Sequence, residues 1–110
     1  MSLSKVTVSK QPGETRLVSM DFSNKMADDE VIVTIDDVTQ SLTDGGVTTD
    51  LTITGEVISV SGQIAQFLVA GGIIPTRPDI KETSYKITVT VTTDADQVLE
   101  NDGLLLVKED

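Results

Sequence analysis

The stretch ETSYKITVTVTTDADQ, residues 82–97, decides the fold class of this chain. Apolar side chains alternate with Lys and Thr side chains, and the apolar ones share one face of an extended backbone: Tyr85, Ile87, Val89 and Val91. A period of two predicts a β-strand with one face in a core and the other in solvent. The stretch ends in Thr93-Asp94-Ala95-Asp96, which predicts either a polar turn or half of a calcium site.

The composition of the whole chain favours the same class of structure. Its 110 residues are the size of one domain, large enough to bury a core without metal ions or disulfides, and there is no cysteine. Val, Ile and Thr are abundant, whereas Trp and His are absent. Because β-branched residues lose side-chain freedom in helices and fit pleated sheets, we expect a single all-β domain.

The acidic charge balance limits the partners that the chain can bind. A net charge of −10 repels phosphate backbones and anionic lipid surfaces, so we expect binding to neither nucleic acid nor membrane. We find no run of about 20 apolar residues that could span a bilayer, and residues 1–5 lack the apolar core of a secretory signal. The sequence leaves open whether Met1-Ser2-Leu3 is native.

Short apolar segments between turn residues predict the strands. About seven strands at a regular short spacing, without an amphipathic helix, indicate a β-sandwich or a small barrel. The segment 31–35 is nearly all β-branched and predicts a central strand, which ends or bends outward at Asp36-Asp37. After a short alternating piece at residues 6–8, the predicted strand segments are residues 16–22, 31–35, 51–54, 57–60, 63–70, 85–93 and 104–108.

Polar segments and segments rich in glycine or proline separate these strands. Residues 23–30 predict a loop or a single helical turn, and Asp44-Gly45-Gly46 predicts a tight turn. Asn101-Asp102-Gly103 predicts a turn or bulge before the last strand. Pro75 and Pro78 exclude a central strand around them, because proline has no N–H to donate to a neighbouring strand.

Tyr85 is the most informative single residue. In immunoglobulin-like sandwiches, a tyrosine near the start of the penultimate strand is buried and hydrogen-bonds the connection that precedes it. Tyr85 follows a long loop and precedes one further strand, so its position fits that role. The alternative is an ordinary core or edge tyrosine, and either role is structural.

We expect no enzymatic activity. Without His or Cys, the chain lacks the usual proton shuttle at neutral pH and the thiolate nucleophile. The segments Asp44-Gly45-Gly46 and Ala70-Gly71-Gly72 lack the Lys-Ser/Thr pair of a phosphate-binding loop. A carboxylate pair that hydrolyses sugars needs an aromatic platform, whereas we place all three aromatic residues in the core: Phe22, Phe67 and Tyr85.

Calcium is the one ligand that the acidic loops suggest, since it binds six to eight oxygens of carboxylates and carbonyls. The sequence lacks an EF-hand pattern, and Asp and Asn are ordinary turn residues, so the turn interpretation is favoured and no cofactor is expected. The weak candidates for a calcium site are Asp94, Asp96, Asn101 and Asp102, and further acidic residues in predicted loops are Asp28, Asp29, Glu30, Asp36 and Asp37.

Two apolar segments are candidate contacts for a partner. If Leu105 and Val107 face the core, Leu104 and Leu106 face outward, and the alternative is a strand buried on both faces.

The second segment is the loop pair Ile73-Ile74, which lies next to two prolines that stiffen the loop. Apolar side chains on a stiff loop anchor an interface at low entropic cost. For this pair, contact with a partner and closure of one end of the sandwich carry equal weight.

Four motifs, in this order and spacing, resemble a family of small virion proteins of tailed bacteriophages. They are PGETRLVSMDFS, DDEVIVTIDDV, VSGQIAQFLVAGG and SYKITVTVTTDADQVLENDGLLLVKE. The family is known as phage fibre–tail adaptor or phage structural proteins, and the resemblance covers about four-fifths of the chain, from Glu14 onward. The segment from Gly72 to Tyr85 is longer than the family pattern, which marks a place for a feature individual to this protein.

The resemblance implies a single immunoglobulin-like antiparallel β-sandwich over residues 16–110, with residues 1–15 as an N-terminal arm or edge strand. It implies a non-enzymatic structural or assembly module of a phage particle, made in the host cytoplasm and located in the virion. Its partners would be other phage structural proteins or further copies of itself. The alternative function is a calcium-dependent or carbohydrate-binding β-sandwich module.

Overall fold

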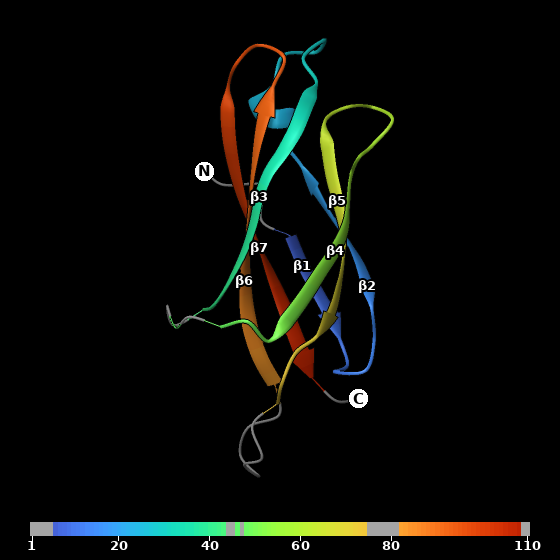
Figure 1. Cartoon of the computed structure of the whole chain (residues 1–110), viewed down its shortest axis with the longest axis vertical. Helices are drawn as coiled ribbons and strands as arrows, with labels where there is room; N and C mark the ends of the chain where they lie inside the picture. Colours follow the sequence, from blue (N-terminus) through green and yellow to red (C-terminus); the bar gives the residue numbers. More distant parts are fainter. Residues whose placement is uncertain (1–5, 44–45, 47, 75–81, 109–110) are drawn as a thin grey trace.

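The computed structural model describes residues 6–43, 46, 48–74 and 82–108, and within these ranges the chain is all-β (Figure 1). This confirms the predicted fold class. One turn of 3-10 helix, Ser23–Lys25, follows the second strand, where a loop or single helical turn was predicted. The strands are β1 (Val6–Lys10), β2 (Arg16–Asp21), β3 (Ile32–Leu42), β4 (Leu51–Ile58), β5 (Ile64–Gly71), β6 (Glu82–Thr93) and β7 (Val98–Lys108).

The strands form two sheets that pack face to face as a sandwich (Figure 1). One sheet has the order β1-β7-β6-β3 and the other β2-β5-β4. All neighbouring strands are antiparallel except β1 and β7, which are parallel. The first and last strands of the described chain therefore lie side by side, and β1 forms one edge of the four-stranded sheet. The immunoglobulin-like subtype stays a prediction.

Both sheets bury one face in a common core, as the alternating sequence pattern requires. The inward register predicted for residues 85–91 is confirmed, because the four apolar side chains of that stretch are at most 2% exposed. Burial of one such large side chain contributes about 1.5–3 kcal/mol. The buried apolar residues are Val18, Met20, Phe22, Ile32, Leu51, Ala65, Phe67, Val69, Tyr85, Ile87, Val89, Val91, Leu105 and Val107.

The last strand is longer than predicted. β7 begins at Val98, so the Asn101-Asp102-Gly103 segment is strand and the prediction of a turn there is wrong. Each of these residues pairs with one residue of β6, and Gly103 is also paired with the start of β1, so cross-strand pairing overrides the local turn preference. The chain reverses instead just after Thr93, where Asp96 adopts a left-handed φ of 62°. Residues 94–96 thus form a turn, as predicted, whereas the calcium interpretation of this segment is not tested by the turn geometry.

Two further boundaries differ from the prediction because bulges bend strands without ending them. Residues 51–54 and 57–60 were predicted as two strands, but one strand, β4, passes through Gly55 with a register shift between Thr54 and Val57. β3 was predicted as a central strand over residues 31–35, yet it lies at the edge of its sheet and extends to Leu42. A second register shift, between Ile35 and Asp37, accounts for the predicted bend there.

Some predicted turn residues lie outside the described residues. They are Asp44, Gly45, Pro75 and Pro78.

Candidate functional site

The buried Tyr85 fixes the connection that precedes β6. Its ring is fully buried, and its hydroxyl accepts a hydrogen bond from the N–H of Ile73 at 3.0 Å and donates one to Oδ2 of Asp50 at 2.9 Å. Burial is the main cause that raises the pKa of this hydroxyl, so it stays protonated as a donor. The predicted role of Tyr85, an inward ring that bonds the preceding connection, is confirmed.

The same network holds an exposed isoleucine in one place. The carbonyl of Ile73 accepts a 2.5 Å hydrogen bond from the hydroxyl of Thr83, so both backbone polar groups of Ile73 are bonded. Its side chain is nevertheless 58% exposed, whereas Ile74 packs against the core. The two residues therefore separate: Ile74 helps to close the end of the sandwich, and Ile73 is accessible to a partner.

Gly72 brings Ile73 into this position. Its φ of 101° lies in the region that L side chains rarely adopt, and a Cβ there would lie 2.7 Å from Cγ2 of Val107. The backbone before Ile73 thus packs directly against the buried Val107 of β7, which fixes the position of the exposed Ile73 side chain relative to that strand.

Leu104 and Leu106 lie on the outer face of the four-stranded sheet, opposite the buried Leu105 and Val107. Both are half-buried, because β7 is flanked on one side by β1 and on the other by β6. Thr83, which bonds Ile73, is on the inner face of β6, whereas Leu106 pairs with Ser84 on the outer face. The two predicted contact segments therefore belong to different surfaces.

A third apolar surface was not predicted from the sequence. On the outer face of the three-stranded sheet, Leu17 pairs with Leu68, and they are 55% and 39% exposed. Val57, on the neighbouring strand, is 53% exposed. The signal was available, because Leu17 precedes buried Val18 and Leu68 lies between two buried residues of β5.

The four calcium candidates serve other purposes in the described structure. Oδ1 of Asp94 accepts the N–H of Val31 at 3.1 Å, and Asp102 accepts the hydroxyl of Thr88 at 2.8 Å. Asp96 occupies the turn.

Asn101 points into the core, where its Nδ2 donates to the carbonyl of Asp21 at 3.0 Å while its Oδ1 has no hydrogen-bond partner. Across the part of the chain that the structure describes, no three acidic side chains gather closely enough to hold a metal ion. The calcium site stays a prediction.

Among the acidic residues that the structure describes, Glu30 accepts the most hydrogen bonds through its carboxylate. Its carboxylate is buried, at 5% exposure, and accepts hydrogen bonds from the hydroxyl of Thr93, the N–H of Ala27 and the side-chain amide of Gln97. These bonds, that from Thr93 foremost, hold the pKa of Glu30 below its ordinary value although burial opposes the shift. Glu30 thus joins the loop before β3 to the β6–β7 turn.

The surface offers no aromatic platform for a sugar. The only aromatic residues of the chain, Phe22, Phe67 and Tyr85, are all fully buried. This arrangement disfavours the stacking interactions on which carbohydrate-binding sites rely. In the segments that the structure describes, no helix has the length and apolar character needed to cross a membrane.

Comparison with known proteins identifies the family. A family model described as "Podophage GP4 fiber-tail adaptor protein gp77" matches residues 10–105, which include all of β2 to β6 and most of β7. Comparisons with curated proteins and with solved structures gave no match. The matched residues include Tyr85, Ile73 and the strands that hold them. The resemblance seen in the sequence is therefore confirmed, and the chain belongs to the podophage GP4 fiber-tail adaptor protein gp77 family.

Proposed function

We propose that this protein is a non-enzymatic structural component of a phage particle that joins tail and fibre proteins through direct protein–protein contacts. The observation that carries the proposal is the family match over residues 10–105. The residue types agree with it, since a chain without His or Cys lacks the commonest catalytic groups. On this proposal the protein resides in the virion, and its partners are other virion proteins or further copies of itself.

Ile73 is the contact residue that the geometry supports best. An isoleucine whose backbone is bonded at both N–H and C=O loses little conformational entropy when a partner covers it. Truncation of a central contact of this kind weakens an interface by about tenfold or more. Leu104 and Leu106 are half-buried already and offer a partner less new surface.

The test is binding between the purified protein and the tail and fibre proteins of the same phage. The wild-type protein is expected to form a complex that survives size-exclusion chromatography and to be incorporated into particles. Ile73→Asp is expected to keep its fold and to bind about tenfold more weakly. Absence of both complex formation and incorporation for the wild-type protein would contradict the proposed function.

Val60→Asp is the matched control. Val60 is fully exposed and lies before β5, whereas Ile73 follows the end of that strand, so the same change of charge is made at the opposite end of the sandwich. Equal loss of binding in both variants would show that added charge, rather than the contact at Ile73, weakens the complex.

We also propose that the sandwich is immunoglobulin-like. In a constant-type immunoglobulin domain, the sheets have the strand orders ABED and CFG. When the seven strands are lettered in sequence, β2-β5-β4 corresponds to B-E-D and β3-β6-β7 to C-F-G, while β1 pairs with β7 instead of β2. The hydrogen bond from Ile73 to the Tyr85 hydroxyl supports the same assignment. An experimental structure with a different strand order would overturn it.

A further inference from the structure

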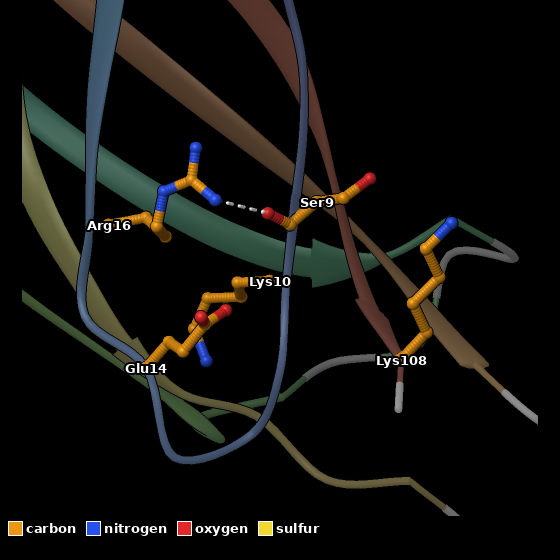
Figure 2. A pocket seen from close by; sticks show the side chains of 5 residues that line it. All are labelled: Ser9, Lys10, Glu14, Arg16 and Lys108. Carbon is orange, nitrogen blue, oxygen red and sulfur yellow. Dashed lines mark hydrogen bonds between the residues drawn. The ribbon is translucent and has the colours of Figure 1, made fainter. Parts of the chain in front are cut away.

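A small hollow lies beside the β1–β2 connection, which joins the two sheets, and the end of β7. Its volume is about 210 Å³, and it is lined by Ser9, Lys10, Glu14, Arg16 and Lys108 (Figure 2). Three cationic side chains and one carboxylate thus meet at one place. In a chain with 8 basic and 18 acidic residues, this is a local reversal of charge. Such a positive site in a negative field attracts an anionic partner group selectively.

Lys10 places a positive charge behind this hollow. The residue is only 3% exposed, and its ammonium donates to the carbonyls of Gln11 at 2.6 Å, of Gly71 at 2.5 Å and of Pro12 at 3.4 Å. Those three bonds use all the donors of a lysine. Lys10 is therefore a fixed charge in the wall and has no N–H to offer to a ligand.

Glu14 does not neutralise the other two cations. One of its carboxylate oxygens accepts the N–H of Gln11 at 2.7 Å, which closes the turn between β1 and β2, and its negative charge acts on Lys10, where it raises the pKa against the effect of burial. Figure 2 shows its carboxylate beside the Lys10 chain and away from Lys108. The carboxylate is thus part of the turn and leaves Arg16 and Lys108 available.

Arg16 is held in place but keeps free donors. Its Nη1 donates to the carbonyl of Ser9 at 2.9 Å, which fixes the guanidinium against the backbone of β1. A guanidinium has five N–H donors, so most of them remain for a second acceptor. Within the described part of the chain, neither Arg16 nor Lys108 forms an ion pair with a carboxylate.

The two available cations lie on opposite sides of β1. In Figure 2, Arg16 is seen on one side of this strand, and Lys108 and the Ser9 hydroxyl are seen on the other. Because β1 is the edge of its sheet, a chain segment can cross it without displacing a neighbouring strand. A segment with two carboxylates can then reach Arg16 and Lys108 together.

We propose that this hollow binds an acidic segment of a partner protein, with one carboxylate held by Arg16 and a second by Lys108 across the edge strand β1. The inference rests on the proposed adaptor function and names the chemistry of one of its partners. Arg16 suits a carboxylate because its fork of N–H groups forms two parallel charge-assisted hydrogen bonds. The net charge of −10 repels longer polyanions such as nucleic acid, so a short acidic peptide segment is the favoured ligand.

The test is a titration of the full chain with the capped peptide acetyl-Gly-Glu-Gly-Glu-Gly-amide, followed by NMR at constant low ionic strength. We expect shifts confined to the amides of residues 9–16 and 106–108 and to the side chain of Arg16. The double variant Arg16→Gln, Lys108→Gln is expected to bind about tenfold more weakly, which corresponds to about 1.4 kcal/mol. Added salt is expected to weaken binding by the wild-type protein.

Two controls make the titration decisive. The same peptide with Gln in place of Glu should not bind, and Lys86→Gln, which removes an exposed lysine from β6, should leave the affinity within about twofold. Binding of the Gln peptide, an equal loss in Lys86→Gln, or no shifts at about 10 mM peptide would each overturn the proposal. If wild-type protein enters particles while the peptide fails to bind, this inference fails and the adaptor function stands.

Discussion

The two ends of the sandwich are each closed by a buried charged side chain, but of opposite sign. At the β6–β7 turn the residue is Glu30, at 5% exposure, and at the far end of β7 it is Lys10, at 3% exposure. Both bridge the two sheets or their connections through several hydrogen bonds. The two ends thus use the same device and can be compared directly.

The comparison shows that the number of bonds alone does not decide whether a buried charge is favourable. For Glu30, hydrogen bonds led by that from Thr93 outweigh burial and lower the pKa, which stabilises the charged carboxylate. For Lys10, burial outweighs the attraction of Glu14 and also lowers the pKa, which disfavours the charged ammonium. Folding therefore stabilises the charge at one end and opposes the charge at the other.

The largest effect is expected from a charge placed between the two ends, where neither set of partners exists. Val89 is fully buried on β6, so Val89→Asp is expected to lower the free energy of unfolding by more than about 4 kcal/mol and to abolish folding. Circular dichroism and urea unfolding would measure the loss. The neighbouring change Thr88→Asn keeps a donor for Asp102 and should change stability by less than about 1 kcal/mol. Similar damage from both would mean that the inward register is wrong.

At the Glu30 end, Glu30→Ala is expected to lower the melting temperature more than Lys10→Met does at the opposite end. The substitution leaves the Thr93 hydroxyl, the Ala27 N–H and the Gln97 amide without their acceptor. The β6–β7 turn should then exchange its amide hydrogens faster, while the far end of β7 does not. Uniform acceleration along β7 would argue against a local clasp.

At the opposite end, Lys10→Met is expected to destabilise the fold by about 1–2 kcal/mol, since it removes the hydrogen bonds to three carbonyls but also a desolvated charge. Thermal and urea unfolding would measure the change. A stabilising effect would show that the burial of the ammonium outweighs its hydrogen bonds completely. A loss larger than that in Glu30→Ala would reverse the comparison.

The smallest effect is expected in the acid dependence of stability. The folded pKa of Glu30 lies below its ordinary value of 4.5, so the unfolded chain takes up the proton first and acidification favours unfolding. Stability present above this range is lost as the pH falls through the folded pKa. Glu30→Gln should flatten the acid limb of the melting-temperature profile, although Asp36, with a pKa lowered by Thr92 and Thr34, retains part of it. An unchanged limb would remove Glu30 from this role.

Much of the fold could be predicted from the sequence because alternation is a local signal. Residues 85–91 carry the period of two without interruption, and their buried face was assigned correctly. The first half of β7 could not be predicted from local preference. Glu100 and the three residues after it have turn chemistry, and only their pairing with β6 makes them strand.

The partner-contact site could be predicted only in part. Ile73-Ile74 was identified from the loop beside the prolines, but the separation of the two side chains depends on Tyr85 and Thr83, which are distant in sequence. Lys10 precedes a turn and looks like an exposed lysine in the sequence. It is buried because the carbonyl of Gly71, 61 residues away, lies against its ammonium.

The parallel pairing of β1 and β7 has a mechanical consequence. The chain enters β1 at one end of the pair and leaves β7 at the other, over the five paired positions from Val6–Gly103 to Lys10–Val107 (Figure 1). Tension applied between the start of β1 and the end of β7 therefore acts along the strands, and the hydrogen bonds of the pair must break together instead of one after another. Such a shear geometry makes the domain resistant to pulling forces that act along β1 and β7.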